Sequence, residues 1–140
     1  MAYLLDTNVL SEAAKADPDA RVRRWIRGLP SSAAFISVVM IGEIRKGVGL
    51  LAHGSRKRSL TTWLEVDLPE RFRGRILDID RLVAESWGRL SAEGRHSGRP
   101  LPVVYGLPLA TAQRYRLTLV TRNVTDCEDR GVRVMNPWSG

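Results

Sequence analysis

The chain opens with Tyr3-Leu4-Leu5-Asp6-Thr7-Asn8-Val9-Leu10, an apolar run that ends in one aspartate and then becomes polar. This pattern is typical of a buried parallel strand with an acid at its carboxyl end. In open α/β sheets, ligand sites form outside the carboxyl ends of the strands. Asp6 is therefore the first candidate for a functional residue.

Two later acids have similar surroundings. Glu43 follows Ile36-Ser37-Val38-Val39-Met40-Ile41-Gly42, and Asp126 follows Leu117-Thr118-Leu119-Val120-Thr121-Arg122-Asn123. Each acid also has a purely structural interpretation: Asp6 as a helix cap, Glu43 as a solvated helical residue paired with Lys46 or Lys57, and Asp126 as a turn former. The shared position of the acids after predicted strands favours a joint role. Three carboxylates at one sheet edge would form a site for a hard divalent cation that acts on phosphodiesters.

Strand and helix patterns alternate along the chain. Short apolar runs predict strands at 2–6, 34–37, 75–79, 117–121 and 132–135. Helical spacing and capping residues predict helices at 7–15, 17–28, 39–52, 53–71, 80–92 and 105–116. The alternation predicts an α/β fold with three layers, α/β/α, around a mostly parallel central sheet. The length of 140 residues predicts a single domain over 1–140.

The composition narrows the class of protein. No apolar stretch approaches the roughly 20 residues that a membrane span needs, and no secretory signal is visible at the N-terminus. The only cysteine, Cys127, excludes an intrachain disulfide and fits a reducing cytosol, so we expect a cytoplasmic protein. The net charge of +7, from 22 basic and 15 acidic residues, raises the expectation of a nucleic-acid partner. A basic surface that only aids solubility is the alternative.

The motifs as a set resemble those of the PIN-domain ribonucleases, and most of all the toxins of VapBC and FitAB toxin–antitoxin pairs. The resemblance covers nearly the whole chain and rests on residues 5–12, 36–47, 119–126 and 132–138. It implies that Asp6, Glu43 and Asp126 are the catalytic, metal-binding acids. It also implies that Asn8, Thr121 and Asn123 support them by orienting Asp6 and a water on the metal.

The resemblance further implies a function and partners. The metal would be Mg²⁺ or Mn²⁺, and the substrate single-stranded RNA, cut to leave 5′-phosphate and 3′-hydroxyl ends. The protein would be a homodimer and would bind a VapB-like or FitA-like antitoxin. Helices near residues 18–65 would form much of the antitoxin surface.

One residue departs from the family pattern. A fourth acid is expected shortly before the helix that contains Ala110-Thr111-Ala112, but Tyr105 occupies its place. A phenol stays neutral at pH 7 and is a poor ligand for Mg²⁺. We therefore predict weak metal affinity and low or absent nuclease activity. Pro108 is a milder departure, expected in the first turn of a helix that starts near Gly106.

Two alternative functions are compatible with parts of this pattern. The first is a catalytically inactive PIN-fold protein that acts by binding antitoxin or RNA. The second is a phosphoryl-transfer domain with Asp6 as phosphoacceptor, which the absence of a lysine in 117–126 disfavours.

Cys127 has no recognisable base partner, which argues against thiol catalysis. Trp138 is interpreted either as a core residue or as part of a partner surface.

Overall fold

The computed structural model describes residues 1–139 and has a central sheet of five parallel strands in the order β3-β2-β1-β4-β5. The strands are β1 (Tyr3–Leu5), β2 (Ala34–Ser37), β3 (Ile76–Leu77), β4 (Thr118–Val120) and β5 (Val134–Met135). The helices are α1 (Thr7–Ala13), α2 (Ala20–Arg27), α3 (Val38–Gly49), α4 (Ser55–Thr62), α5 (Leu68–Arg71), α6 (Arg81–His96), α7 (Val103–Tyr115) and α8 (Val124–Cys127).

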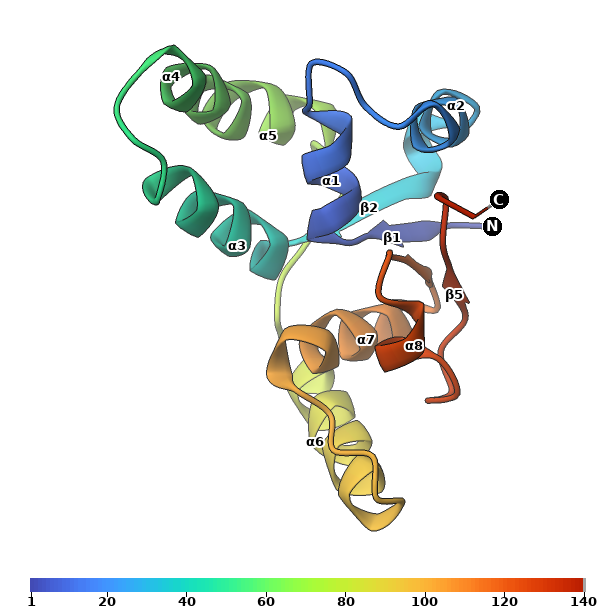
Figure 1. Ribbon diagram of the computed structural model, residues 1–140. Coiled ribbons are helices and arrows are strands. Elements are labelled where there is room, and N and C mark those ends of the chain that lie inside the picture. The colour runs from blue at the N-terminus through green and yellow to red at the C-terminus, as the bar shows by residue number, and fades with distance from the viewer. Residues whose placement is uncertain (140) are drawn as a thin grey trace.

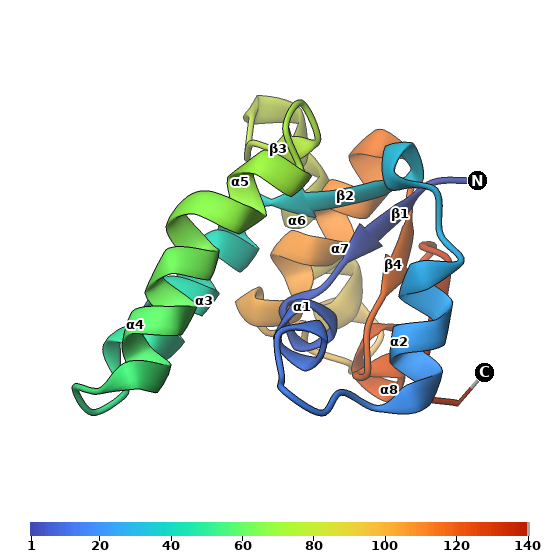
Figure 2. The same cartoon turned by 90° about the horizontal axis from the view of Figure 1, so that it is seen from above.

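The helices cover both faces of the sheet. In Figure 1, α1 and α2 lie above the strands and α6 and α7 lie below them, while α3 and α4 extend to one side. Figure 2 looks from above onto the face of the sheet and shows β1 between β2 and β4. The predicted α/β/α architecture with a parallel sheet is thus confirmed. Within residues 1–139, no helix has the length and hydropathy to cross a bilayer.

The three inner strands, β1, β2 and β4, are mostly apolar because both of their faces are covered. Leu4, Leu5, Ile36, Leu119 and Val120 are each at most 2% exposed and form the centre of the core. The strand order reverses at β1, whose neighbours β2 and β4 lead to opposite ends of the sheet. Such a switch point is where α/β folds form their ligand sites, and Asp6 follows β1 directly.

Helix starts follow the capping residues. Asp6 caps α1 by accepting a hydrogen bond from the Thr7 amide, and Asp80 caps α6 as expected, through the Val83 amide. Asp19 caps α2, so that Pro18 lies before this helix instead of in its first turn.

Two further helix predictions need correction. The helix predicted at 53–71 is divided into α4, a π-helical turn at Trp63–Asp67, and α5. Helix α7 begins at Val103 and not near Gly106, because the Pro102 carbonyl accepts bonds from the amides of Tyr105 and Gly106. Pro108 therefore lies in the second turn, where its missing N–H costs a helical hydrogen bond.

Candidate metal centre at the carboxyl edge of the sheet

Asp6 lies directly after β1, and each of its two carboxylate oxygens accepts a hydrogen bond. Oδ1 accepts from the Thr7 amide at 2.8 Å, and Oδ2 accepts from Thr121 Oγ1 at 2.8 Å. The residue is only 7% exposed. Burial raises the pKa of Asp6 above its ordinary value, against the opposing effect of these two hydrogen bonds. The residue that caps α1 is therefore also a buried carboxylate, and its ionisation lowers the stability of the fold.

Thr121 is the centre of the polar network that supports this carboxylate. Its hydroxyl is fully buried, donates to Asp6 and accepts from Asn8 Nδ2 at 3.2 Å and from the Asn123 amide at 3.1 Å. Asn8 Oδ1 in turn accepts from the Arg122 amide at 3.2 Å. The three predicted supporting residues thus lie together around Asp6, and they join α1 to the loop after β4.

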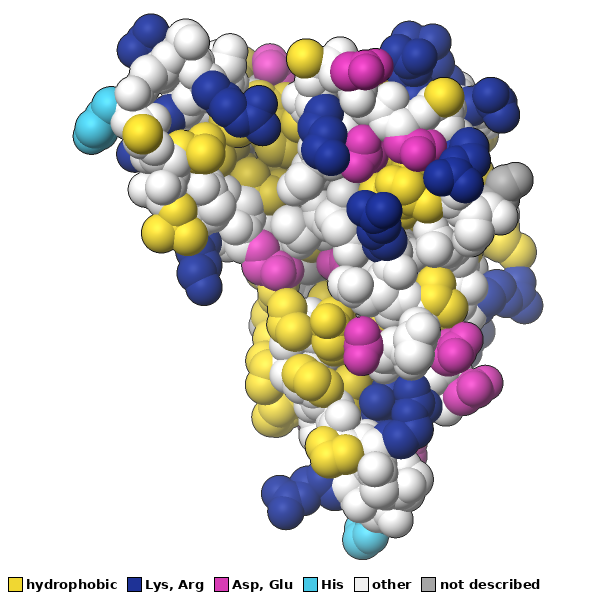
Figure 3. Space-filling view, in the orientation of Figure 1, with side chains coloured by type: hydrophobic (Ala, Val, Ile, Leu, Met, Phe, Trp, Pro, Cys, Tyr) yellow, Lys and Arg dark blue, Asp and Glu magenta, His cyan; other side chains and the backbone are white. Residues whose placement is uncertain are grey.

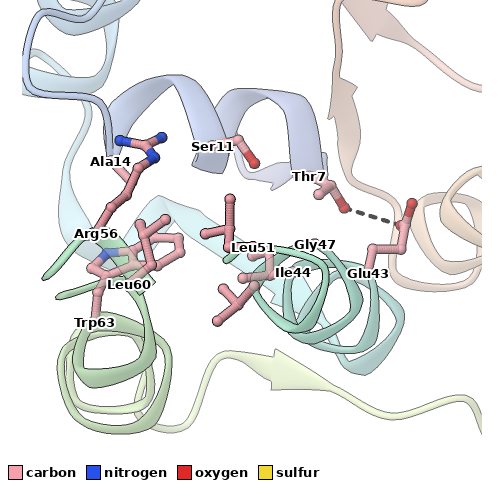
Figure 4. A pocket seen from close by; sticks show the side chains of 11 residues that line it. Thr7, Ser11, Ala14, Glu43, Ile44, Gly47, Leu51, Arg56, Leu60 and Trp63 are labelled. Atoms are coloured by element: carbon pink, nitrogen blue, oxygen red, sulfur yellow. Dashed lines mark hydrogen bonds between the residues drawn. The ribbon is translucent and has the colours of Figure 1, made fainter. Parts of the chain in front are cut away.

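Glu43 reaches the same place from the second turn of α3. Its Oε1 accepts from Thr7 Oγ1 at 3.0 Å, as Figure 4 shows. Burial is the main factor that raises the pKa of Glu43, and the negative charge of Asp6 adds to it. Within residues 1–139, the ion pairs with Lys46 or Lys57 that the structural interpretation invoked do not form. Thr7 therefore links the two acids, a role that the sequence did not reveal.

Asp6 and Glu43 line one open pocket of about 250 Å³. Its walls are formed by Asp6, Thr7, Asn8, Glu43, Val104, Tyr105 and Asn123. Figure 3 shows acidic side chains in the recess on this face and hydrophobic side chains on the surface next to it. Two acids from separate elements thus meet at the predicted edge of the sheet.

Asp126 takes a different position from the other two acids. It is exposed on α8 and does not line this pocket, although its charge acts on Tyr105. Among residues 1–139, no three Asp, Glu, His or Cys side chains converge closely enough to hold one ion. The structure brings Asp6 and Glu43 together and leaves Asp126 at the margin of the site.

Tyr105, which stands where the resemblance predicts a fourth acid, forms part of the pocket wall. Loss of hydration raises the pKa of the Tyr105 phenol, and the carboxylate of Asp126 raises it further. The phenol therefore remains protonated at neutral pH. It supplies no negative charge to the pocket.

Two arginines that the sequence reasoning missed hold the segment around Asp126. Arg99 donates to the carbonyls of Thr125 at 3.1 Å and Glu128 at 3.0 Å. Arg130 donates to the Asp126 carbonyl at 2.9 Å and to the Arg99 carbonyl at 3.1 Å. Both guanidinium groups are used on backbone oxygens, so they fix the position of α8.

Cys127, next to Asp126, is not suited to nucleophilic chemistry. It is buried, and burial together with the charges of Asp6 and Asp126 raises its pKa to about 12. The thiol is thus protonated at neutral pH, and a thiolate is the reactive form. This agrees with the sequence-based argument against thiol catalysis.

A more apolar pocket of about 220 Å³ adjoins the acid site and shares Thr7 and Glu43 with it. Figure 4 shows its lining side chains, which come from α1, α3 and α4 and from the residues that directly follow these helices. They include Ile44, Leu51, Leu60 and Trp63, with Arg56 at the side. An apolar groove thus leads from the carboxylates toward α4.

The donor set of the acid pocket fits a small divalent cation. Mg²⁺ is commonly held by one or two carboxylates and keeps several waters. Asp6 and Glu43 supply two carboxylates that repel each other, and neither forms an ion pair within residues 1–139. The negative charge of Asp6 is one of the factors that raise the pKa of Glu43. A bound cation would offset this charge.

Comparison with known proteins identifies the family. The PIN domain model matches residues 3–125. The chain is 35% identical to Toxin FitB of Neisseria gonorrhoeae over 135 residues, which are 96% of this chain and 97% of that protein. It is 31% identical to VapC ribonuclease Y4jK of Sinorhizobium fredii over 135 residues, 96% of each chain. The crystal structure of FitAcB from Neisseria gonorrhoeae superimposes with a TM-score of 0.92 at 34% identity, covering 97% of this chain and 98% of that chain. The chain belongs to the PIN-domain family, which confirms the resemblance found in its sequence.

Proposed function

We propose that this protein is the toxin of a type II toxin–antitoxin pair and a metal-dependent endoribonuclease of reduced activity. The observation that carries the proposal is the pair of carboxylates, Asp6 and Glu43, that share one pocket at the switch point of the sheet. The names of the similar proteins, Toxin FitB and VapC ribonuclease Y4jK, support the same class of activity. The whole chain would act as one domain, in the cytoplasm.

Asp6 and Glu43 would bind the cation directly. A bound Mg²⁺ or Mn²⁺ would activate a water for in-line attack on phosphorus and neutralise charge on the scissile phosphate of single-stranded RNA. Thr121 keeps one oxygen of Asp6 oriented by its hydrogen bond, while Thr7 orients Glu43. Asn8 and Asn123 restrain the hydroxyl of Thr121 and so support Asp6 from behind.

Asp126 would be the third and weakest ligand. It stands outside the pocket lining, and Arg99 and Arg130 hold the backbone of α8, so Asp126 would reach the ion only through its own side chain or a bridging water. Tyr105 lies at the place where the family has its fourth acid, and its phenol stays neutral. The site is therefore short of negative charge, which is the physical reason to expect weak metal binding.

Substitution of Tyr105 tests this proposal. We expect Tyr105→Asp to bind Mn²⁺ at least about tenfold more tightly than the parent, since even indirect ligand contacts change metal affinity by 10- to 100-fold. Cleavage of single-stranded RNA should rise with it. Tyr105→Phe is the matched control, because it changes the phenol without adding charge, and it should match the parent in both assays.

Two results would contradict the proposal. One is strong, equal cleavage by the parent and Tyr105→Asp, which would show that the missing acid does not matter. The other is the absence of cleavage by Tyr105→Asp in excess Mn²⁺, which would remove the nuclease assignment. Glu43→Gln in the Tyr105→Asp background should abolish cleavage. This result would show that the cleavage comes from the acid pocket.

The position of Tyr105 and the marginal position of Asp126 favour a second candidate, an inactive PIN-fold protein that acts by binding its antitoxin or RNA. In both cases we propose a homodimer whose antitoxin, of VapB or FitA type, covers the surface near residues 18–65. The apolar groove between α1, α3 and α4 lies largely within this surface. A gel-shift with the antitoxin beside the cleavage assay separates the candidates, since binding without cleavage supports the second.

A further inference from the structure

Arg122 lies on the loop that follows β4, at the carboxyl edge of the sheet. It lies between Thr121, which holds Asp6, and Asn123, which lines the pocket. Its backbone amide donates to Asn8 Oδ1 at 3.2 Å. The backbone of Arg122 is therefore tied to α1 within one residue of the proposed metal-binding site.

The side chain of Arg122 is also held in place. Its guanidinium carbon lies 4.9 Å from the centre of the Trp138 ring, a cation–π contact. Trp138 is only 6% exposed, and its amide donates to Asn136 Oδ1 at 2.9 Å. Trp138 is thus a core residue, and its buried indole gives the guanidinium a rigid surface on which to rest.

The charge of Arg122 is not neutralised by any acid of residues 1–139. Its side chain is exposed and takes part in none of the ion pairs found there. Arg99 and Arg130 differ, because their guanidinium groups donate to backbone carbonyls. Arg122 therefore offers its donors to solvent, although stacking has already restricted its freedom.

We infer that Arg122, oriented by Trp138, binds a backbone phosphate of single-stranded RNA next to the phosphate that enters the acid pocket. The inference rests on the proposed function. A guanidinium forms paired hydrogen bonds with phosphate, and prior orientation lowers the entropy lost on binding. The unpaired positive charge of Arg122 also attracts an anionic strand to the loop after β4, where the strand would follow the carboxyl edge of the sheet. The structural alternative is that Arg122 only covers Trp138.

The test compares two stacked arginines. Arg122→Gln removes the proposed contact. Arg114→Gln removes the same charge from a guanidinium that lies 5.1 Å from the Tyr115 ring, in the last turn of α7 at the opposite edge of the sheet. Binding of a fluorescent single-stranded RNA 12-mer is followed by anisotropy with Mg²⁺ over a range of salt, and a gel checks that the RNA is intact. Thermal melting of each variant shows whether it remains folded.

We expect Arg122→Gln to weaken RNA binding about tenfold, the effect of one charge-assisted hydrogen-bonded contact. The slope of log affinity against log salt should fall in magnitude by about 0.7, the value for one phosphate contact on a single strand. Arg122→Lys keeps the charge but loses the stacked, forked geometry, and should fall between Arg122→Gln and the parent. Arg114→Gln should leave affinity within about twofold of the parent.

Equal losses at positions 122 and 114 would overturn the inference, and so would a lower melting temperature for Arg122→Gln with unchanged RNA affinity. Full retention of affinity by Arg122→Lys would show that only the charge matters and would refute the role of Trp138. If Tyr105→Asp cleaves RNA while the two glutamine variants behave alike, the inference fails and the proposed function stands. If the parent and Tyr105→Asp neither bind nor cleave RNA, both fail.

Discussion

Thr121→Val is the substitution that most directly tests how the site holds its buried acid. Valine matches threonine in shape but cannot replace its hydroxyl. The change removes the bond from Oγ1 to Asp6 Oδ2 at 2.8 Å and the acceptor used by Asn8 and the Asn123 amide. A hydrogen bond to a charged group contributes about 1.5–3 kcal/mol, and the half-exposed asparagine groups recover much of their loss from water. The expected loss in unfolding free energy at pH 7 is therefore about 2–4 kcal/mol.

The loss should depend on pH in a defined direction. The pKa of Asp6 is already raised by burial above 3.8, and removing a hydrogen bond that lowers it raises it further. When the pKa of a carboxyl group is higher in the folded than in the unfolded state, the free energy of unfolding falls as pH rises through the folded-state pKa. The variant loses more than the parent over this range, so the difference between them grows from pH 4 to pH 7. At pH 4 it should shrink toward the roughly 1 kcal/mol of a neutral hydrogen bond.

Urea unfolding at the two pH values measures this difference, and Thr111→Val is the control. Thr111 is equally buried, but its hydroxyl donates only to the Leu107 carbonyl within α7, at 2.8 Å. Its substitution should cost no more than about 1.5 kcal/mol and show no pH dependence. A loss for Thr121→Val below about 0.5 kcal/mol at pH 7, or one equal at both pH values, would refute the reasoning.

Two further predictions concern the acid pair and the support of α8. Burial and the charge of Asp6 raise the pKa of Glu43 above 4.5, so Glu43→Gln should be more stable than the parent at pH 7 by less than about 1 kcal/mol, because partial exposure screens the charge; differential scanning fluorimetry should show the advantage disappear below pH 4.5. Gly94→Ala would place a Cβ 2.6 Å from the Arg99 carbonyl oxygen, and should cost about 1–3 kcal/mol in urea unfolding. At Gly88, in the same helix, an added Cβ would have no atom from outside the helix within 4 Å, so Gly88→Ala should stabilise the protein by up to about 1 kcal/mol. Equal effects of the two substitutions would contradict the packing argument.

The sequence predicted the sheet and the first acid because both depend on local patterns. A run of apolar residues that ends in Asp6 specifies a strand buried on both faces and a polar carboxyl end. The strand at 34–37 and the cap at Asp80 follow from equally local signals, and the structure has both. Helix boundaries were less predictable where backbone hydrogen bonds compete, as at the start of α7, where Pro102 begins the helix before Tyr105.

The parts of the site that the sequence did not reveal depend on tertiary contacts. Thr7 is adjacent to Asp6 in sequence, but only the packing of α1 against α3 places its hydroxyl beside Glu43. The stacking of Arg122 on Trp138 requires two loops from neighbouring strands to meet. No spacing rule encodes such contacts, because each depends on the register of the sheet.

The energetics of Asp6 explain why its surroundings are so polar. A buried carboxylate that is ionised at neutral pH reduces the stability of the fold, and its raised pKa expresses that cost. Thr121 and the Thr7 amide offset part of the cost through hydrogen bonds, but the repulsion between Asp6 and Glu43 remains. A bound divalent cation would remove this repulsion and would stabilise the folded state by about 2.7 kcal/mol at a concentration 100 times its dissociation constant. Mn²⁺ should therefore raise the melting temperature of the parent and fail to raise that of Glu43→Gln. Equal shifts in the two proteins would show that the ion binds elsewhere and that the carboxylate pair has another purpose.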